Sequence, residues 1–140
     1  MGQLGFGVRG GAEVAVHAAR KFLLNLLDDL AMIKLDFHNA FNYVRRDKML
    51  EAVRDLAPTV YPLVHSAYSA PSTLFWGDHI IMSAEGVQQG DPLGPLLYCL
   101  SIYRHFANLR SAFCVMYLND VTIVGNMEDI LHDLIDTIIW

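Results

Sequence analysis

The chain has 140 residues, of which 54% are hydrophobic and 18% are charged, and its formal net charge at pH 7 is −5. This composition excludes a disordered chain, the length fits one domain with a sizeable core, and the charge alone does not indicate a nucleic-acid binder. We expect no membrane span, since no apolar run is long enough, and no signal peptide, since the first residues lack an apolar segment.

The first half of the sequence predicts helices around one buried strand. Residues 12–30 have the apolar spacing of a helix, with one face formed by Leu23, Leu26, Leu27 and Leu30. The apolar run "AMIKLDF", residues 31–37, predicts a buried strand. A second helix is expected over residues 46–57, and after a proline-marked break a further helix reaches Tyr68.

The second half alternates hairpins and helices. Gly77 and Asp78 form a turn signal between two short apolar runs, 72–76 and 79–85, which predicts a β-hairpin. The remaining segments are a loop, a helix, a second hairpin and an amphipathic helix, over residues 86–94, 95–110, 112–125 and 127–140.

Two of the predicted strands carry an acid at one end. Asp36 closes the apolar run "IKLDF", and Asp120 lies in the polar turn of "VMYLNDVTIVG". Taken singly, Asp36 fits a helix N-cap and Asp120 fits a hairpin turn. Taken together, two strands that each deliver an acid can place both at one edge of a sheet. Convergent carboxylates of this kind hold Mg²⁺ beside substrate phosphates.

The loop "EGVQQGDPLG" is a third candidate for chemistry. Gly90 lets the backbone approach a ligand closely, and Gln89 offers an amide donor and acceptor. The alternative is a surface turn that caps the following helix, with Asp91 near the cap. From these residues alone, the turn is the simpler interpretation.

The three segments together resemble motifs A, B and C of reverse transcriptases, in the order "KLDFHNAFNYVRRDKML", "EGVQQGDPLGPLL" and "VMYLNDVTIVG". The resemblance is greatest to the enzymes of non-LTR (LINE-like) retrotransposons, and it covers essentially the whole chain. It implies an α+β fold, the polymerase palm, in which a small antiparallel sheet is backed by helices. Residues 1–30, which include "GFGVRGG", would be a fingers remnant, and residues 31–140 would be the palm.

The resemblance also implies roles for individual residues. Asp36 and Asp120 would ligate two Mg²⁺ ions, and the backbone carbonyl of Phe37 would add a metal contact. Phe41 would exclude a 2′-hydroxyl group and so select deoxynucleotides. The residues that would contact or frame the incoming nucleotide and template are Gln89, Gly90 and Tyr117. The expected partners are an RNA or DNA template-primer and a deoxynucleoside triphosphate.

The sequence departs from the family pattern at several points. Asn119 stands where the family has the first aspartate of motif C, so one negative charge is missing at the expected metal site. A loss of about 4 kcal/mol of transition-state stabilisation would slow the reaction about 10³-fold. Gly94 stands where the family more often has Ser, and the sequence stops before the region of the family's thumb. We therefore expect an impaired RNA-directed DNA polymerase domain. The alternative is a non-catalytic, retrotransposon-derived protein that keeps the fold for binding nucleic acid or protein.

Other sites are disfavoured or left open. "GFGVRG" fits the dinucleotide-binding pattern only formally, since no predicted strand precedes it. The six histidines lack paired metal-ligand spacing. Arg45, Arg46 and Lys48 form a short basic cluster, which fits either contact with phosphates or a solvated helix start.

Overall fold

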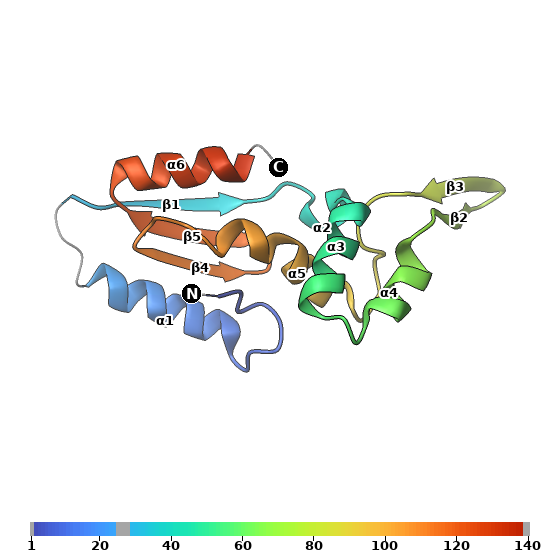
Figure 1. The fold of residues 1–140 in the computed structure, drawn as a ribbon, viewed down its shortest axis with the longest axis horizontal. Coiled ribbons are helices and arrows are strands. Elements are labelled where there is room, and N and C mark those ends of the chain that lie inside the picture. Colours follow the sequence, from blue (N-terminus) through green and yellow to red (C-terminus); the bar gives the residue numbers. More distant parts are fainter. Residues whose placement is uncertain (1, 25–28, 139–140) are drawn as a thin grey trace. The chain divides into compact units, whose positions relative to one another are not determined.

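The computed structural model describes residues 2–24 and 29–138 (Figure 1). The helices are α1 (Gly11–Leu23), α2 (Ala40–Tyr43), α3 (Arg46–Leu56), α4 (Tyr61–Tyr68), α5 (Gly94–Phe106) and α6 (Met127–Ile138). The strands are β1 (Ala31–Asp36), β2 (Ser72–Trp76), β3 (His79–Ser83), β4 (Phe113–Tyr117) and β5 (Asp120–Gly125). The chain divides into two compact units, which we call the sheet unit (residues 1–38 and 102–140) and the hairpin unit (residues 39–101).

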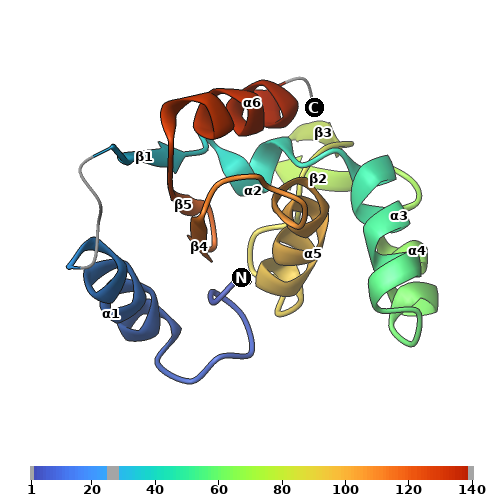
Figure 2. The same cartoon turned by 60° about the vertical axis from the view of Figure 1, so that its left-hand side comes forward.

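The sheet unit is built on an antiparallel three-stranded sheet in the order β1-β5-β4. Burial alternates along β1, so that Ile33 and Leu35 are more buried than Lys34 and Asp36. The prediction of a buried strand was therefore wrong in its burial, because this strand has one half-buried and one exposed face. Helix α1 packs on β4, and α6 packs on β5 and β1. Figures 1 and 2 show these two helices on opposite sides of the sheet. The sheet is therefore the central layer of this unit.

Apolar side chains of α1 hold it against the sheet. Phe113, Val115 and Val124 are buried in one cluster, and Phe22 packs on Phe113 with their ring centroids 4.7 Å apart. Alanines line the rest of the α1 surface in this cluster, at Ala15, Ala18 and Ala19. Such small side chains let a helix lie close to a sheet, where burial of apolar area stabilises the contact.

The hairpin unit combines packed helices with an exposed β-hairpin. Helices α3 and α4 pack together, and Met49, Val53 and Val64 are buried in this unit. Strands β2 and β3 pair through a turn in which Gly77 has φ 57°, a value that favours glycine. The large side chains of the hairpin remain exposed, with Phe75 at 77% and Trp76 at 72%. Helix α5 begins in this unit, and its last residues belong to the sheet unit.

The mixed helical and antiparallel fold confirms the predicted α+β class, and the predicted strands and hairpins are present. The long N-terminal helix was predicted wrongly, because α1 ends at Leu23. Leu30 lies outside the helix and packs against the buried cluster of the sheet, which explains its apolar character without helical spacing. Leu26 and Leu27 lie outside the described residues.

Two smaller differences have local causes. Helix α5 ends at Phe106 rather than near residue 110, and the backbone N–H of Arg110 instead donates to the buried Asp133 carboxylate (2.9 Å). Helix α2 was not predicted, since its single turn is too short for a periodic signal. Within the described residues, no helix combines the length and the apolar character needed to cross a membrane.

Candidate metal and nucleotide site

The two candidate carboxylates are neighbours at one edge of the sheet. Asp36 ends β1 and Asp120 begins β5, and the antiparallel register pairs these two residues directly. The same register pairs Asp120 with Tyr117, the last residue of β4. Directly paired residues in a sheet project their side chains to the same face. The structure therefore brings Asp36, Asp120 and Tyr117 together in one row across the three strands.

A tight turn joins β4 to β5 and carries Asn119. The turn consists of Leu118 and Asn119, and Leu118 has φ 53°, in the left-handed region that L side chains rarely adopt. Tight hairpin turns usually place Gly where φ is positive. From this turn, the Asn119 side chain reaches Asp36 on the first strand.

Each carboxylate has a partner from this chain. The Asn119 Nδ2 atom donates a hydrogen bond to Asp36 Oδ1 (2.8 Å), and Lys34 Nζ lies 2.9 Å from Asp120 Oδ1. The hydrogen bond with Asp120, aided by the charge of that carboxylate, raises the pKa of Lys34 above its usual value, so this amine stays protonated. Like charges opposite each other destabilise a sheet, and these two donors reduce that repulsion.

The donor set fits a divalent metal bound jointly with substrate. Two adjacent carboxylates offer the hard oxygen ligands that Mg²⁺ prefers, and Mg²⁺ commonly takes only one or two of them, with phosphates and water completing its coordination. In residues 2–24 and 29–138, no group of three or more His, Cys, Asp or Glu side chains forms a complete metal site. The carboxylate pair alone would therefore make up only part of the coordination sphere of such an ion.

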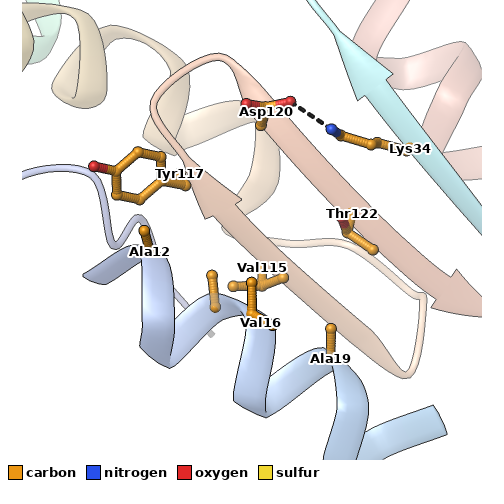
Figure 3. A pocket seen from close by; sticks show the side chains of 9 residues that line it. Ala12, Val16, Ala19, Lys34, Val115, Tyr117, Asp120 and Thr122 are labelled. Carbon is orange, nitrogen blue, oxygen red and sulfur yellow. Dashed lines mark ion pairs between the residues drawn. The ribbon is translucent and has the colours of Figure 1, made fainter. Parts of the chain in front are cut away.

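A cavity of about 250 Å³ lies between α1 and the sheet, next to Asp120 (Figure 3). Its walls are mainly apolar, and the Lys34–Asp120 ion pair supplies the charged groups of its lining. Ligand pockets usually enclose about 300–1,000 Å³, so this space is small for a nucleotide. We do not assign the nucleotide to it.

The other predicted site residues occupy different surroundings. Phe37 belongs to the sheet unit and packs edge-on against Phe106, with their ring centroids 6.1 Å apart. Phe41, in the hairpin unit, stacks on the buried Tyr98 ring at 4.5 Å. Gln89 and Gly90 are exposed in the loop before α5, where Gly90 has φ 89° and so adopts a backbone conformation that favours glycine.

A buried polar network that the sequence did not reveal supports this loop. Arg46 is only 7% exposed, and its guanidinium donates to the carbonyl oxygens of Ser83 (2.7 Å), Gly86 (3.0 Å) and Glu85 (3.2 Å). It also donates to the Ser83 hydroxyl (2.9 Å). Neither sequence interpretation of the basic cluster applies to Arg46, which holds the end of β3 and the start of the loop. Arg45 and Lys48 instead pair with Asp47 and Glu51.

Tyr68 continues this network toward Gln89 and Gly90. Its hydroxyl donates to Asp91 Oδ2 (2.5 Å) and accepts from the Gln88 backbone N–H (3.2 Å). Burial, together with the hydrogen bond to Asp91, raises the pKa of Tyr68 to about 12, so the hydroxyl remains a donor at neutral pH. The Arg46 guanidinium lies over the Tyr68 ring, 5.2 Å from its centroid. Only the tertiary structure shows that these residues support one loop.

Comparison with known proteins identifies the family. The family described as "Reverse transcriptase (RNA-dependent DNA polymerase)" matches residues 6–139. The chain belongs to the reverse transcriptase family. It is 30% identical to the probable RNA-directed DNA polymerase from transposon BS of Drosophila melanogaster, over 85% of this chain and 15% of that protein. It is 31% identical to the retrotransposable element SLACS 132 kDa protein of Trypanosoma brucei gambiense, over 89% of this chain and 11% of that protein.

A solved structure shows the same fold. Apo telomerase from Candida tropicalis, truncated from its C-terminal domain, matches 92% of this chain and 31% of that chain with a TM-score of 0.64 and 19% identity. The predicted palm-like fold and the predicted resemblance to retrotransposon reverse transcriptases are thus confirmed. This reverse transcriptase chain spans only a small part of the length of each of these proteins.

Proposed function

We propose that this chain forms the palm of an RNA-directed DNA polymerase, with an RNA or DNA template-primer and a deoxynucleoside triphosphate as substrates. Asp36 and Asp120 hold divalent metal, with Mg²⁺ as the physiological ion. The observation that carries the proposal is the direct pairing of these two acids across β1 and β5. Membership of the reverse transcriptase family supports the same reaction.

The chain's own residues have distinct tasks at this site. When bound, divalent metal would activate the primer 3′-hydroxyl and stabilise the charge on the transferred phosphoryl group. Asp36 and Asp120 supply the anionic oxygens, and the Phe37 backbone carbonyl adds a neutral one. Lys34 would compete with a bound cation for the negative charge of Asp120, since its amine already pairs with Asp120 Oδ1.

The residues proposed to contact the nucleotide are assigned within each unit separately. We assign sugar selection to Phe41, whose ring is fixed by stacking on Tyr98. Gln89 and Gly90 are assigned to the incoming nucleotide and the template, which their exposure and the positive φ of Gly90 permit. Tyr117 is assigned to the same nucleotide contact because it lies in the row with Asp36 and Asp120.

Asn119 is the main expected weakness of this polymerase site. Its amide supplies no negative charge, and its Nδ2 atom donates to the Asp36 carboxylate that the metal would use. A site with one charge fewer binds cations less tightly and stabilises the developing negative charge less. We therefore propose an impaired polymerase. The alternative, a non-catalytic binding protein, makes a different prediction for the Asn119→Asp variant.

The test compares Asn119→Asp with Asn126→Asp. Both variants add one carboxylate to the sheet unit, but Asn126 lies beyond the opposite end of β5 from the turn. Without metal, Asn119→Asp should cost about 1 kcal/mol, because it replaces a donor to Asp36 by a repelling charge. With millimolar Mg²⁺ or Mn²⁺ the sign should reverse, and this variant should gain more thermal stabilisation than the wild type.

Melting curves with and without metal, and primer extension, are the measurements. A larger metal response in Asn119→Asp than in Asn126→Asp, together with faster primer extension, is the expected result. An equal metal response in the wild type and both variants would contradict a metal site at this turn. A larger metal response without any primer extension would favour the non-catalytic alternative for the chain on its own.

A further inference from the structure

Gln3 contacts the metal-site turn from the other end of the sequence. Its Oε1 atom accepts a hydrogen bond from the Leu118 backbone N–H (2.8 Å), and its Nε2 atom donates to the Leu118 backbone carbonyl (3.0 Å). One amide side chain thus binds both backbone groups of one turn residue. Oε1 also accepts from the Gly5 backbone N–H (2.9 Å), which fixes the side chain against its own segment.

The N-terminal segment is itself attached to β4, beside this turn. Gln3 forms a parallel bridge with Met116, and the Leu4 backbone N–H donates to the Met116 carbonyl (2.8 Å). Leu118 lies two residues after Met116, the bridge partner of Gln3. The Gln3 side chain therefore lies beside Leu118, within hydrogen-bond distance. Backbone and side-chain hydrogen bonds therefore join the N-terminal segment to the end of β4 and to the turn.

Leu118 needs an external restraint. Its φ of 53° lies in the left-handed region, where a β-carbon crowds the backbone and a side chain other than Gly or Asn is disfavoured. The backbone at Gly5 lies very close to Leu118, because a Cβ atom added at Gly5 would be 2.5 Å from the Leu118 backbone nitrogen. The two hydrogen bonds to Gln3 offset the cost of the strained conformation.

We propose that Gln3 is a positioning residue for the reverse transcriptase site, one that holds Leu118 in its left-handed conformation and so sets where Asn119 and Asp120 point. The proposal rests on the proposed function only for its consequence, the metal affinity of the carboxylate pair. Binding both the N–H and the carbonyl of one residue requires a side chain that donates and accepts. The Gln3 amide does both, and its side chain is long enough to reach Leu118.

The experiment uses the whole chain and graded variants of Gln3. Gln3→Ala removes every hydrogen bond of the side chain, whereas Gln3→Glu keeps the acceptor and loses the donor to Leu118. Hydrogen exchange of the Leu118 amide, followed by NMR, reports on the turn. We expect exchange about tenfold faster in Gln3→Ala and an intermediate rate in Gln3→Glu.

Mn²⁺ binding, followed by the loss of its EPR signal at a temperature where each variant is folded, reports on the carboxylates. Removal of a group that orients metal ligands typically weakens binding by about tenfold or more, and this loss is expected for Gln3→Ala. Asn126→Ala is the matched control. It removes an amide that caps α6, in the same unit but remote from the turn, and it should leave both readouts unchanged.

The outcomes separate this proposal from the proposed function. An unchanged Leu118 exchange rate in folded Gln3→Ala would overturn the positioning role, as would faster exchange with unaltered Mn²⁺ affinity. If wild-type protein binds no Mn²⁺, the proposed metal site fails. The Leu118 exchange rates of the two Gln3 variants would then decide alone whether Gln3 holds the turn.

Discussion

Two loops carry candidate site residues, one in each unit, and they are held in opposite ways. In the hairpin unit, the buried Arg46 and Tyr68 hold the chain around Gln89 and Gly90 from inside. In the sheet unit, the carboxylates beside the Leu118–Asn119 turn are partnered at the surface, and the Lys34 and Asp120 side chains are 65% and 47% exposed. The first arrangement fixes a backbone shape, whereas the second leaves charged groups free to exchange partners.

This difference follows from the energetics of burial. A buried polar group without its partner costs far more than an exposed one, because water cannot replace the lost contact. An exposed ion pair contributes only about 0–1 kcal/mol, so a competing cation can displace it at little cost. Exposed pairs therefore suit groups that exchange partners, and buried hydrogen-bonded side chains suit a loop of fixed shape.

The largest effect is expected for Arg46→Ala. The substitution removes the donors of three buried or half-buried carbonyls, and we expect the free energy of unfolding to fall by about 3 kcal/mol. Urea denaturation measures this change. Arg54→Ala is the matched control, because Arg54 pairs with Asp55 at the surface and should cost less than about 1 kcal/mol. Equal losses in the two variants would contradict the buried anchor.

Asp133 extends the comparison, since it is a buried anchor in the sheet unit with the opposite charge. It is 2% exposed, and its carboxylate accepts hydrogen bonds from the backbone N–H groups of Arg110 and Ser111 and from the Ser111 hydroxyl. Burial alone would raise its pKa, but these hydrogen bonds outweigh burial and hold the pKa below the usual 3.8.

Asp133→Asn should cost about 2 kcal/mol at neutral pH, because its amide nitrogen cannot accept the donors that face it. A lowered folded-state pKa adds stability that is present above the unfolded-state pKa, near 3.8, and is lost as the pH falls through the folded-state value. The difference between wild type and Asp133→Asn should therefore shrink below about pH 4. Denaturation curves across this range measure it, and a difference independent of pH would exclude the ionised anchor.

The smallest effect is expected for Lys34→Met. Loss of an exposed ion pair should change the free energy of unfolding by less than about 1 kcal/mol. Mn²⁺ affinity should rise by a few-fold, because no internal cation then competes for Asp120. Titration of both proteins with Mn²⁺ measures the change. A loss of stability of 2 kcal/mol or more would show that Lys34 is an anchor of the same kind as Arg46.

Helices and strands were predicted well where the residues that indicate them are neighbours in the sequence. The apolar run ending at Asp36 and the Gly77 turn signal gave a strand and a hairpin in the expected places. The boundary of α1 was wrong because Leu30 is apolar for a tertiary reason, its packing against the sheet. Periodicity cannot distinguish a helical leucine from one that meets the core through extended backbone.

For the candidate site, the sequence by itself determined the chemical groups. It placed Asp36 and Asp120 as acids at strand ends, and it identified the family to which their order belongs. It also predicted that Asn119 leaves a charge missing at the site. These are properties of residue type and spacing, which exist before folding.

Only the tertiary structure decided how those groups are held. The direct pairing of Asp36 with Asp120 depends on strand register. The hydrogen bonds of Gln3 with Leu118 join residues 115 positions apart, and those of Arg46 with Ser83 join residues 37 apart. No local pattern encodes such contacts, because their geometry arises only when distant segments pack together.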